Sequence, residues 1–399
     1  MDLEVTAEEA EFRERARQWL LEHLPGEPYP GDSHAARAYE LEWQRVQFEG
    51  GWAGISWPVE YGGLGLSPVE QMIWYEEYAL AGAPSPRASF VGLRHAGPTL
   101  ILRGTDAQKS FHLPRILRGE VSWCQGFSEP GAGSDLASLR TRAEIDGDHL
   151  VVTGQKIWTS YGDVADWQEL LVRTNPDAAK HRGITWVICD MATPGIEARP
   201  IRTIAGGSDF CEVFYDEVRI PLANVVGEVD DGWSVAMSTL SFERGTAFIA
   251  EQVRLAKTVD DLTAAAAEVT GPDGRRPAIA DDEIARRLAR ATAEVAALRA
   301  MTYASISRAR AAGPGVQPGA EASLVRLLYG ELEQRVARLA MDVFGADSVS
   351  ASMFEVPAPA ELKRRWVFEY LMSFQATIAA GTKDIQRNII GERVLGLPR

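Results

Sequence analysis

Residues 125–135 read Gln-Gly-Phe-Ser-Glu-Pro-Gly-Ala-Gly-Ser-Asp, and residues 154–160 read Gly-Gln-Lys-Ile-Trp-Thr-Ser. Alone, the first stretch is typical of a flexible loop. The second places an aromatic ring directly before two hydroxyl groups, after a β-rich run. A flavin needs a flat apolar or aromatic wall, donors for its pyrimidine oxygens, and small residues where its pyrophosphate approaches. The two stretches together therefore indicate a flavin site.

Short β-type runs separated by turns surround these stretches, from residue 122 to about residue 227. The runs are Arg140–Ile145, His149–Thr153, Glu169–Arg173, Ile184–Cys189 and Cys211–Ile220. Asp146-Gly147-Asp148, between the first two runs, is typical of a hairpin turn. The region 119–229 is therefore predicted to be a β-barrel or sandwich domain.

Helical patterns precede this region. Thr6 and Glu9 form a capping-box pattern, in which each side chain satisfies an orphan backbone N–H group. Apolar residues then recur at helical spacing up to Pro25-Gly26: Phe12, Ala16, Trp19 and Leu20. Further helices are expected at Ala35–Gly50, Pro68–Ala81 and Gly97–Arg118.

The pattern is helical again from residue 232 onward. Its clearest segments are Asp281–Arg310, Ala320–Phe344 and Glu361–Ala380, with Gly/Pro-rich connectors at 271–280 and 313–319. The sequence therefore predicts an α+β multidomain protein. Its parts are an N-terminal helical domain (1–118), a middle β-domain (119–229) and a C-terminal helical bundle (230–399).

Composition excludes several classes of function. The 399 residues carry a formal net charge of −15, which argues against nucleic acid as the main partner but does not exclude a local basic patch for a phosphate. The sequence contains no apolar run long enough to span a membrane and no signal-peptide pattern at its N-terminus, so we expect a cytoplasmic protein. Cys124, Cys189 and Cys211 lack metal-ligand spacing and are expected to be free thiols, and no metal site is predicted.

The C-terminal residues 379–391 read Ala-Ala-Gly-Thr-Lys-Asp-Ile-Gln-Arg-Asn-Ile-Ile-Gly. Together with the two flavin-site stretches and their spacing, this segment resembles the acyl-CoA dehydrogenase family over essentially the full length. Within the family, the chain is similar to the catalytic subunit of actinobacterial heterotetrameric members that act on CoA thioesters of sterol side chains. The resemblance implies the acyl-CoA dehydrogenase fold with a C-terminal four-helix bundle, FAD as cofactor, and α,β-dehydrogenation of an acyl-CoA thioester.

The resemblance also implies roles for individual residues. Phe127, Ser128, Trp158 and Ser160 would line the isoalloxazine ring, the two serines by hydrogen bonds and Trp158 by stacking. Ser134 would lie near the CoA arm or the flavin phosphate. Thr382 would contact the cofactor from the C-terminal domain. The alternative for Trp158 is a core tryptophan of the β-domain.

The expected catalytic base is displaced from its usual place. Most family members keep a Glu just before the C-terminal Gly-Thr, where this chain has Ala380, whose side chain cannot take a proton. A minority place the Glu on a bundle helix, followed by Arg, and Glu243-Arg244 fits that pattern. The α-proton is weakly acidic, so the base needs a dry pocket and a polarised thioester carbonyl. The backbone N–H of Ala380 can still donate to the thioester oxygen.

The alternative for Glu243 and Arg244 is an ordinary charged pair on a helix surface. Apolar neighbours argue against it: Leu240, Phe242, Phe248 and Ile249. Glu243 is therefore predicted to be the base, and Arg244 to contact substrate.

Two segments depart from the pattern of homotetrameric members, which hold a neighbour's FAD with an Arg-x-x-Phe-Gly-x-Pro stretch and a Gln-x-x-Gly-Gly stretch. Here Gly271 and Gly274 stand where the Arg and Phe should be, and Asp342 stands in the Gln position. Either other residues of this chain hold the neighbour's FAD, or a paralogous subunit supplies the missing Arg, Phe and Gln in an α2β2 heterotetramer. We expect the paralogous partner.

Three functions remain open from the sequence. The first is an acyl-CoA dehydrogenase that passes electrons to an electron-transfer flavoprotein. The second is a non-catalytic subunit that scaffolds a paralogue, and the third is an acyl-CoA oxidase. The small Ala380 opposite a displaced base leaves room for a bulky or branched acyl group, with Phe90, Trp74 and Tyr75 as candidate lining residues.

Overall fold

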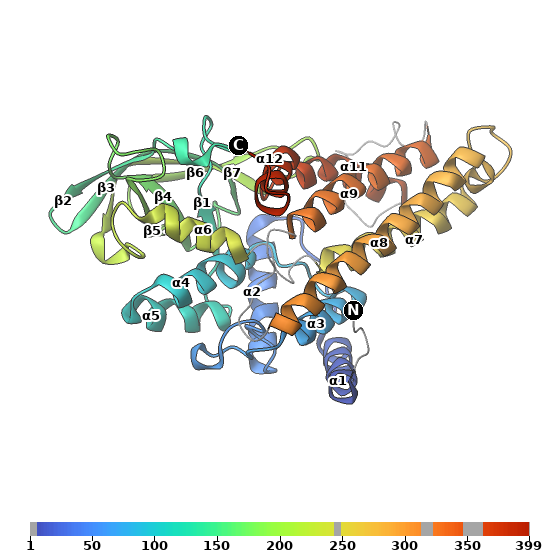
Figure 1. Cartoon of the computed structure of the whole chain (residues 1–399), viewed down its shortest axis with the longest axis horizontal. Coiled ribbons are helices and arrows are strands. Elements are labelled where there is room, and N and C mark those ends of the chain that lie inside the picture. Colours follow the sequence, from blue (N-terminus) through green and yellow to red (C-terminus); the bar gives the residue numbers. More distant parts are fainter. Residues whose placement is uncertain (1–5, 243–248, 313–321, 346–361, 399) are drawn as a thin grey trace.

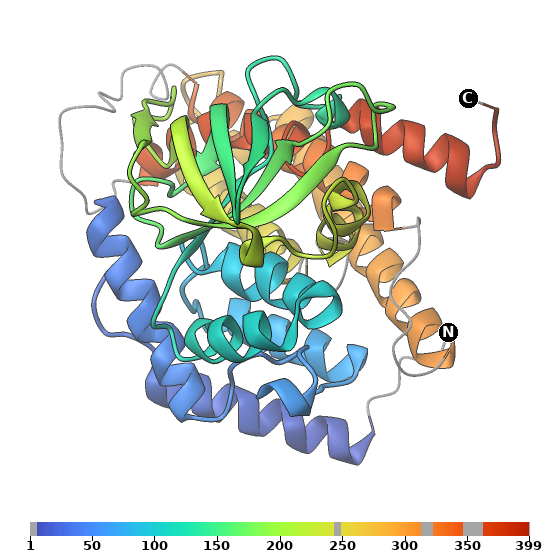
Figure 2. The same ribbon diagram turned by 90° about the vertical axis from the view of Figure 1, so that its left-hand side faces the viewer.

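The computed structural model describes residues 6–242, 249–312, 322–345 and 362–398. Helices, a β-sheet and a second set of helices follow one another along the chain (Figure 1). In Figure 2 the sheet lies above the N-terminal helices. The predicted α+β architecture is confirmed, and its middle part is one curled, seven-stranded sheet. No helix of the described residues is long and apolar enough to cross a membrane.

The N-terminal helices begin where the sequence places capping residues. These helices are α1 (Ala7–His23), α2 (Ser33–Glu49), α3 (Pro68–Leu80), α4 (Gly97–Arg103) and α5 (Asp106–Leu117). The capping box predicted at Thr6 is confirmed, and Ser67 and Thr105 make the same motif before α3 and α5. Apolar faces of α1, α2 and α3 meet in a cluster rich in tryptophan, including Trp43 and Trp74.

The single helix expected at Gly97–Arg118 is wrong. Helix α4 ends at Arg103, and Gly104 after it is extended, with a ψ of 157°. Thr105 then caps a new helix, α5. A second feature, the π-helical turn η2 (Gly92–Ala96), directly precedes α4 and matches no periodicity used to find helices.

The sheet contains β1 (Trp123–Gly126), β2 (Arg142–Asp146), β3 (His149–Ser160), β4 (Trp167–Arg173), β5 (Ile184–Asp190), β6 (Ile196–Ile201) and β7 (Phe210–Pro221). Its order is β1-β4-β2-β3-β7-β6, with β5 paired to β4. The predicted turn at Asp146–Asp148 is confirmed: it joins antiparallel β2 and β3, and Gly147 has a φ of 63°. β1 and β6 were not predicted, and β3 runs on to Ser160, so the second flavin-site stretch is itself part of a strand.

The C-terminal helices are α6 (Gly232–Phe242), α7 (Ile249–Glu268), α8 (Asp282–Ala312), α9 (Ala322–Phe344), α11 (Leu362–Ser373) and α12 (Lys383–Ile389). α7, α8, α9 and α11 pack together around a shared apolar core. α6 instead packs against β5, α4 and η2, so it links the sheet to the N-terminal helices. The helix expected at Glu361–Ala380 leaves α-helical geometry after Ser373 and continues as the 3-10 turn η7 (Phe374–Thr377).

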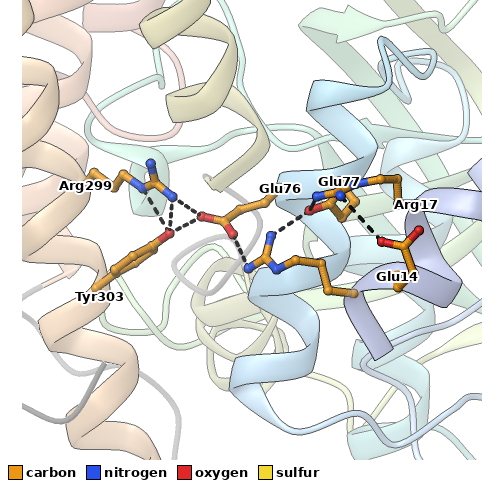
Figure 3. A network of polar contacts seen from close by, with 7 residues as sticks. Glu14, Arg17, Glu76, Glu77, Arg299 and Tyr303 are labelled. Atoms are coloured by element: carbon orange, nitrogen blue, oxygen red, sulfur yellow. Dashed lines mark hydrogen bonds and ion pairs between the residues drawn. The ribbon is translucent and has the colours of Figure 1, made fainter. Parts of the chain in front are cut away.

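A buried network of charges ties the N-terminal helices to the bundle (Figure 3). Glu76 and Glu77 of α3 are buried carboxylates. Arg13 of α1 donates to both, at 2.8 and 2.6 Å. Arg17 donates to Glu77 at 2.8 Å, and Arg299 of α8 donates to Glu76 at 3.0 Å. The network therefore joins α3 to α1 on one side and to α8 on the other.

Replacing Arg13 with methionine is expected to lower the free energy of unfolding by about 1–3 kcal/mol. Both carboxylates lose a charged donor inside the protein, but each keeps another arginine, which limits the loss. The shift in the denaturation midpoint measures the effect. Arg15→Met is the control, because Arg15 is an exposed residue of the same helix. Equal losses in the two variants would contradict the assignment.

Candidate active site

The two stretches singled out in the sequence lie side by side. Ile157 N–H donates to the carbonyl oxygen of Ser128 at 2.9 Å. Lys156 Nζ donates to the carbonyl oxygen of Phe127 at 3.1 Å and to Glu129 Oε1 at 2.8 Å. The Lys156 side chain is fully buried. The loop at residues 127–129 is therefore attached to β3 from inside the protein.

The charges of this attachment are balanced locally. Glu129 also accepts the backbone N–H groups of Arg140 at 2.6 Å and Thr141 at 2.8 Å. Burial opposes ionisation of Glu129, but Lys156 and Thr141 outweigh it and hold the pKa of that carboxyl below its usual value. Burial lowers the pKa of Lys156 to about 8, although Glu129 opposes the shift. The pair is therefore a charged hydrogen-bonded unit at neutral pH.

Strand β3 is distorted where it carries Trp158. The register between β3 and β7 shifts between Lys156 and Thr159, which marks a bulge. Trp158 has a φ of 62°, uncommon for a residue with a β-carbon, and its side chain is 58% exposed. Its ring meets the ring of Phe210 edge-on, with centroids 6.2 Å apart. Trp158 is therefore not a core tryptophan: the bulge turns a flat aromatic surface outward.

The surrounding groups fit a flavin. Ser128 and Ser160 are half-buried residues, and their hydroxyls make no hydrogen bond within the described part of the chain, so both are available to a ligand. The hydroxyl of Thr159 is buried and also lacks a partner there. Gly131 and Gly133 have no heavy atom within 4 Å of an added β-carbon, and Ser134 beside them is exposed. An aromatic wall, hydroxyl donors and an open Gly-rich loop are the set that a flavin and its phosphates require.

The C-terminal turn holds Ala380 in a strained conformation. Ala380 has a φ of 53° and Gly381 a φ of 86°. Gln386 Nε2 donates to the carbonyl oxygen of Ala380 at 3.0 Å, and Arg326 Nη2 donates to that of Ala379 at 2.9 Å. These bonds fix the turn, and the exposed Ala380 amide donates to no backbone carbonyl of the described residues. Its N–H group is thus free to meet a ligand.

Thr382 follows this turn as the N-cap of α12, accepting the N–H of Ile385 at 3.3 Å. Within the described ranges, no hydrogen bond, ion pair or ring contact joins Ala380 or Thr382 to the sheet residues around Trp158. The structure therefore groups Phe127, Ser128, Trp158 and Ser160, and leaves the C-terminal pair as a separate element.

Glu243 and Arg244 lie outside the described residues. The helix that leads directly to them, α6, is described up to Phe242. Thr239 on its last turn shares a buried hydrogen bond with Thr99 of α4, their hydroxyl oxygens 2.9 Å apart. α6 also packs against η2.

A cavity of about 80 Å³ lies beside η2 in the N-terminal helices. Trp74 and Tyr75, two of the expected lining residues, are in its wall, whereas Phe90 is not. Phe90 instead lies beneath the guanidinium of Arg94, which does line the cavity. No sequence pattern pointed to Arg94, because a π-helical turn shifts side chains off the regular helical spacing.

A buried polar cluster joins η2 to the sheet, and it too was missed in the sequence. His95 Nδ1 lies 3.2 Å from Glu169 Oε1 of β4, and Gln125 Nε2 donates to the same oxygen at 2.7 Å. Gln125 is two residues before Phe127. The cluster therefore fixes η2 against the strand that leads into the flavin-site loop. Contacts between residues so far apart in the chain leave no local sequence signal.

The two segments that depart from the homotetramer pattern are held by local hydrogen bonds and by an ion pair. Residues 270–277 form a tight turn, in which Gly271 N–H donates to Arg276 O at 2.7 Å and Gly274 has a φ of 68°. A β-carbon on Gly271 would lie 2.9 Å from Ala278 Cα. Asp342 accepts from Arg287 Nη1 at 2.7 Å, so an arginine on α8 offsets its charge.

Three family models match the chain in succession. They describe the N-terminal domain (residues 6–120), the middle domain (124–218) and the C-terminal domain (230–395) of acyl-CoA dehydrogenase. The matches together cover nearly the whole sequence.

Relatives and solved structures agree with these models. The chain is 39% identical over 397 residues to acyl-CoA dehydrogenase IpdE1 of Mycobacterium tuberculosis, covering 98% of each. It is similar to the ChsE4-ChsE5 complex of the same organism (34% identity, TM-score 0.81) and to the Tcur3481-Tcur3483 steroid ACAD (30%, 0.82), in both cases over 100% of each chain. The chain therefore belongs to the acyl-CoA dehydrogenase family and is an acyl-CoA dehydrogenase.

Proposed function

We propose that this chain is the catalytic subunit of an FAD-dependent enzyme that introduces an α,β double bond into a bulky or branched acyl-CoA thioester, such as that of a sterol side chain. The observation that carries the proposal is the arrangement at β3. The buried Lys156–Glu129 pair attaches the loop at residues 127–129 to the strand, beside an outward-facing Trp158. The names of the steroid ACAD structures support the choice of substrate class.

The residues that would hold the cofactor are Phe127, Ser128, Trp158, Ser160 and Thr382. Trp158 presents a flat wall, and the two serine hydroxyls are available as hydrogen-bond donors. The exposed Ser134, in the Gly-rich loop, would meet the CoA arm or a flavin phosphate. When bound, FAD accepts the hydride that leaves the β-carbon.

The chain's own chemistry would be proton removal and carbonyl polarisation. Glu243 would take the α-proton, and Arg244 would help to bind the substrate. The Ala380 N–H, held by a turn that Gln386 and Arg326 fix in place, would donate to the thioester oxygen and stabilise the negative charge that grows there. This donor is a backbone N–H group. It would therefore be present in this chain, which has Ala380, as it is in family members that have glutamate at this position.

The partner would be a paralogous subunit in an α2β2 assembly, with an electron-transfer flavoprotein as electron acceptor. Support comes from Gly271, Gly274 and Asp342, which cannot supply the Arg, Phe and Gln of homotetrameric members. Asp342 is already engaged by Arg287, so it offers a pyrophosphate no net attraction. The similar ChsE4-ChsE5 structure is, by its title, a complex.

Co-expression of this chain with a paralogous subunit encoded beside its gene tests the proposal. The expected product is a heterotetramer with two FAD per four chains, whose flavin absorbance is bleached anaerobically by bulky or branched CoA esters. A stable, FAD-saturated homotetramer of this chain alone would overturn the partner. Failure of every ester, from C4 to steroid-sized, to bleach the flavin would overturn the activity.

A second candidate, a non-catalytic subunit that scaffolds a paralogue, is favoured by one observation. Ala380 occupies the position where most of the family keeps a carboxylate, and its side chain has no acid–base chemistry. Variants of each subunit separate the two candidates, because turnover must be lost when the base is removed from the catalytic chain.

A further inference from the structure

The loop between β4 and β5 carries three basic residues in succession: Lys180, His181 and Arg182, called here the basic turn. All three are exposed residues. The protein as a whole is acidic, with a formal net charge of −15, so this turn runs against the overall charge. A cluster of exposed cations on an acidic protein is a candidate site for an anionic ligand.

Arg173, the last residue of β4, fixes the shape of the basic turn. Its guanidinium group donates to the carbonyl oxygens of Lys180 and Arg182, with distances of 2.9–3.3 Å. The same group donates to the carbonyl oxygens of Ala137 at 2.6 Å and Leu139 at 3.4 Å. Arg173 therefore joins the basic turn to the segment that directly follows the Gly-rich loop. Because these bonds use backbone carbonyls only, they leave the three basic side chains uncommitted.

Two side-chain contacts place the basic turn between the Gly-rich loop and α6. Lys180 Nζ lies 2.5 Å from Asp135 Oδ2, in an exposed ion pair. The His181 ring packs on the ring of Trp233 at the start of α6, with centroids 4.8 Å apart. The guanidinium of Arg182 makes no hydrogen bond or ion pair within the described ranges. The turn thus offers a ligand one cation that is held by a carboxylate and one that is not.

We propose that the basic turn binds the phosphate groups at the nucleotide end of the CoA thioester. This inference rests on the proposed dehydrogenation of an acyl-CoA. Phosphate oxygens accept charge-assisted hydrogen bonds from lysine and arginine, and a planar guanidinium such as that of Arg182 can donate two at once. The neighbouring Gly-rich loop leaves room for the ligand, since no heavy atom lies within 4 Å of a β-carbon added at Gly131 or Gly133.

The distance from the basic turn to the proposed base suits this ligand. Trp233, which His181 contacts, is in the first turn of α6, and the chain passes from the last residue of that helix, Phe242, to Glu243. From Trp233 to Phe242 the helix extends about 14 Å, at about 1.5 Å per residue. In CoA, the pantetheine arm separates the phosphates from the thioester, so a phosphate site belongs well away from the base.

Asp135 competes with a phosphate for Lys180. An exposed ion pair contributes little to stability, so a phosphate can replace the carboxylate at small cost. Asp135→Asn removes both the competitor and its repulsion of the ligand, and is therefore expected to tighten CoA binding, whereas Lys180→Gln should weaken it. An ion pair that only held the turn in shape would give the two variants effects of the same sign.

The test measures dissociation constants by calorimetry on the FAD-loaded co-expressed complex, with CoA, 3′-dephospho-CoA and 4′-phosphopantetheine as probes. In the wild type, at least one step of this series should raise the Kd by about 10-fold, the factor that a hydrogen bond between charged groups provides. The step shows whether the 3′-phosphate or the diphosphate is bound. It should disappear in Lys180→Gln/Arg182→Gln, and it should shrink in the wild type as the salt concentration rises, because the cations are exposed.

Arg219→Gln is the matched control. Arg219 pairs with Asp146 at 2.7 Å, and its side chain is 50% exposed, as is that of Lys180. This variant should bind the three probes as the wild type does.

Equal Kd values for the three probes in the wild type, or an unchanged step in the double variant, would overturn the phosphate site while the dehydrogenation stands. Loss of FAD affinity instead of CoA affinity in the double variant would assign the turn to a flavin phosphate and would also overturn the proposal. Absence of CoA binding to the folded, FAD-loaded wild-type complex would overturn the proposed function itself.

Discussion

Replacing Glu243 with glutamine is expected to slow turnover by about 10²–10⁴-fold while FAD remains bound. Glutamine keeps the size of the side chain but cannot take the α-proton. The groups proposed to hold the cofactor lie on β3, on its attached loop and, for Thr382, at the start of α12, so their contacts should not change. The measurement is anaerobic bleaching of the flavin by substrate, together with the ratio of bound FAD to protein.

The matched control is Glu268→Gln. Glu268 is an exposed glutamate at the C-terminal end of α7, the helix that follows residue 243 in the chain. It should bleach at the wild-type rate. Undiminished bleaching in Glu243→Gln would show that another carboxylate is the base. If replacing the catalytic glutamate of the paralogous subunit with glutamine stopped turnover instead, this chain would be the non-catalytic scaffold.

The parts of the fold predicted from sequence are those with strong local causes. Thr6 and Glu9 are three residues apart, and their reciprocal hydrogen bonds form as predicted. Gly147 sits in a turn that requires a positive φ, which glycine adopts without strain. Such features depend on neighbours in the chain, so one sequence is enough to find them.

The parts that were missed depend on distant contacts. β6 pairs along one edge with β7, and its alternation of half-buried and exposed residues gives a weak signal. The end of α4 at Gly104, and the cap that Thr105 makes for α5, interrupt an apolar pattern that continues across both helices. Arg94 and His95 owe their positions to a π-helical turn and to partners from α3 and β4.

The candidate site shows the same division. Residues 125–135 and 154–160 were singled out together on composition and spacing, and the structure places them in contact. The sequence does not predict their attachment by Lys156 and Glu129, because these two residues are 27 positions apart and no local pattern pairs them. A sequence does not show whether a charged residue on a β-strand is buried. Its burial can be inferred only once the residue of opposite charge that pairs with it is known.

Lys156→Met is expected to lower the free energy of unfolding by about 3–5 kcal/mol and to weaken FAD retention. Unlike the carboxylates that Arg13 joins, Glu129 has no other cation as a hydrogen-bond partner in the described structure, and its side chain is 8% exposed. Removing Lys156 leaves that charge inside the protein with two backbone N–H groups. It also frees the carbonyl of Phe127, so the loop loses its side-chain attachment to β3 and keeps the backbone hydrogen bond between Ile157 and Ser128. Thermal unfolding and the FAD dissociation constant measure the two effects.

The double variant Lys156→Met/Glu129→Gln separates loss of charge balance from loss of packing. It should recover a large part of the unfolding free energy, because no uncompensated charge remains, whereas a purely steric role for Lys156 would leave it as unstable as the single variant.

A pH series adds a second check. In the wild type the lowered pKa of Glu129 stabilises the fold above its ordinary value near 4.5, and this stability is lost as pH falls through the folded-state pKa. In Lys156→Met the buried carboxyl should bind a proton more readily on folding, so that variant should gain stability as pH falls. The difference between the two proteins should therefore shrink from pH 7 to about pH 5, and a difference that stays constant over this range would show that the ion pair does not hold the loop.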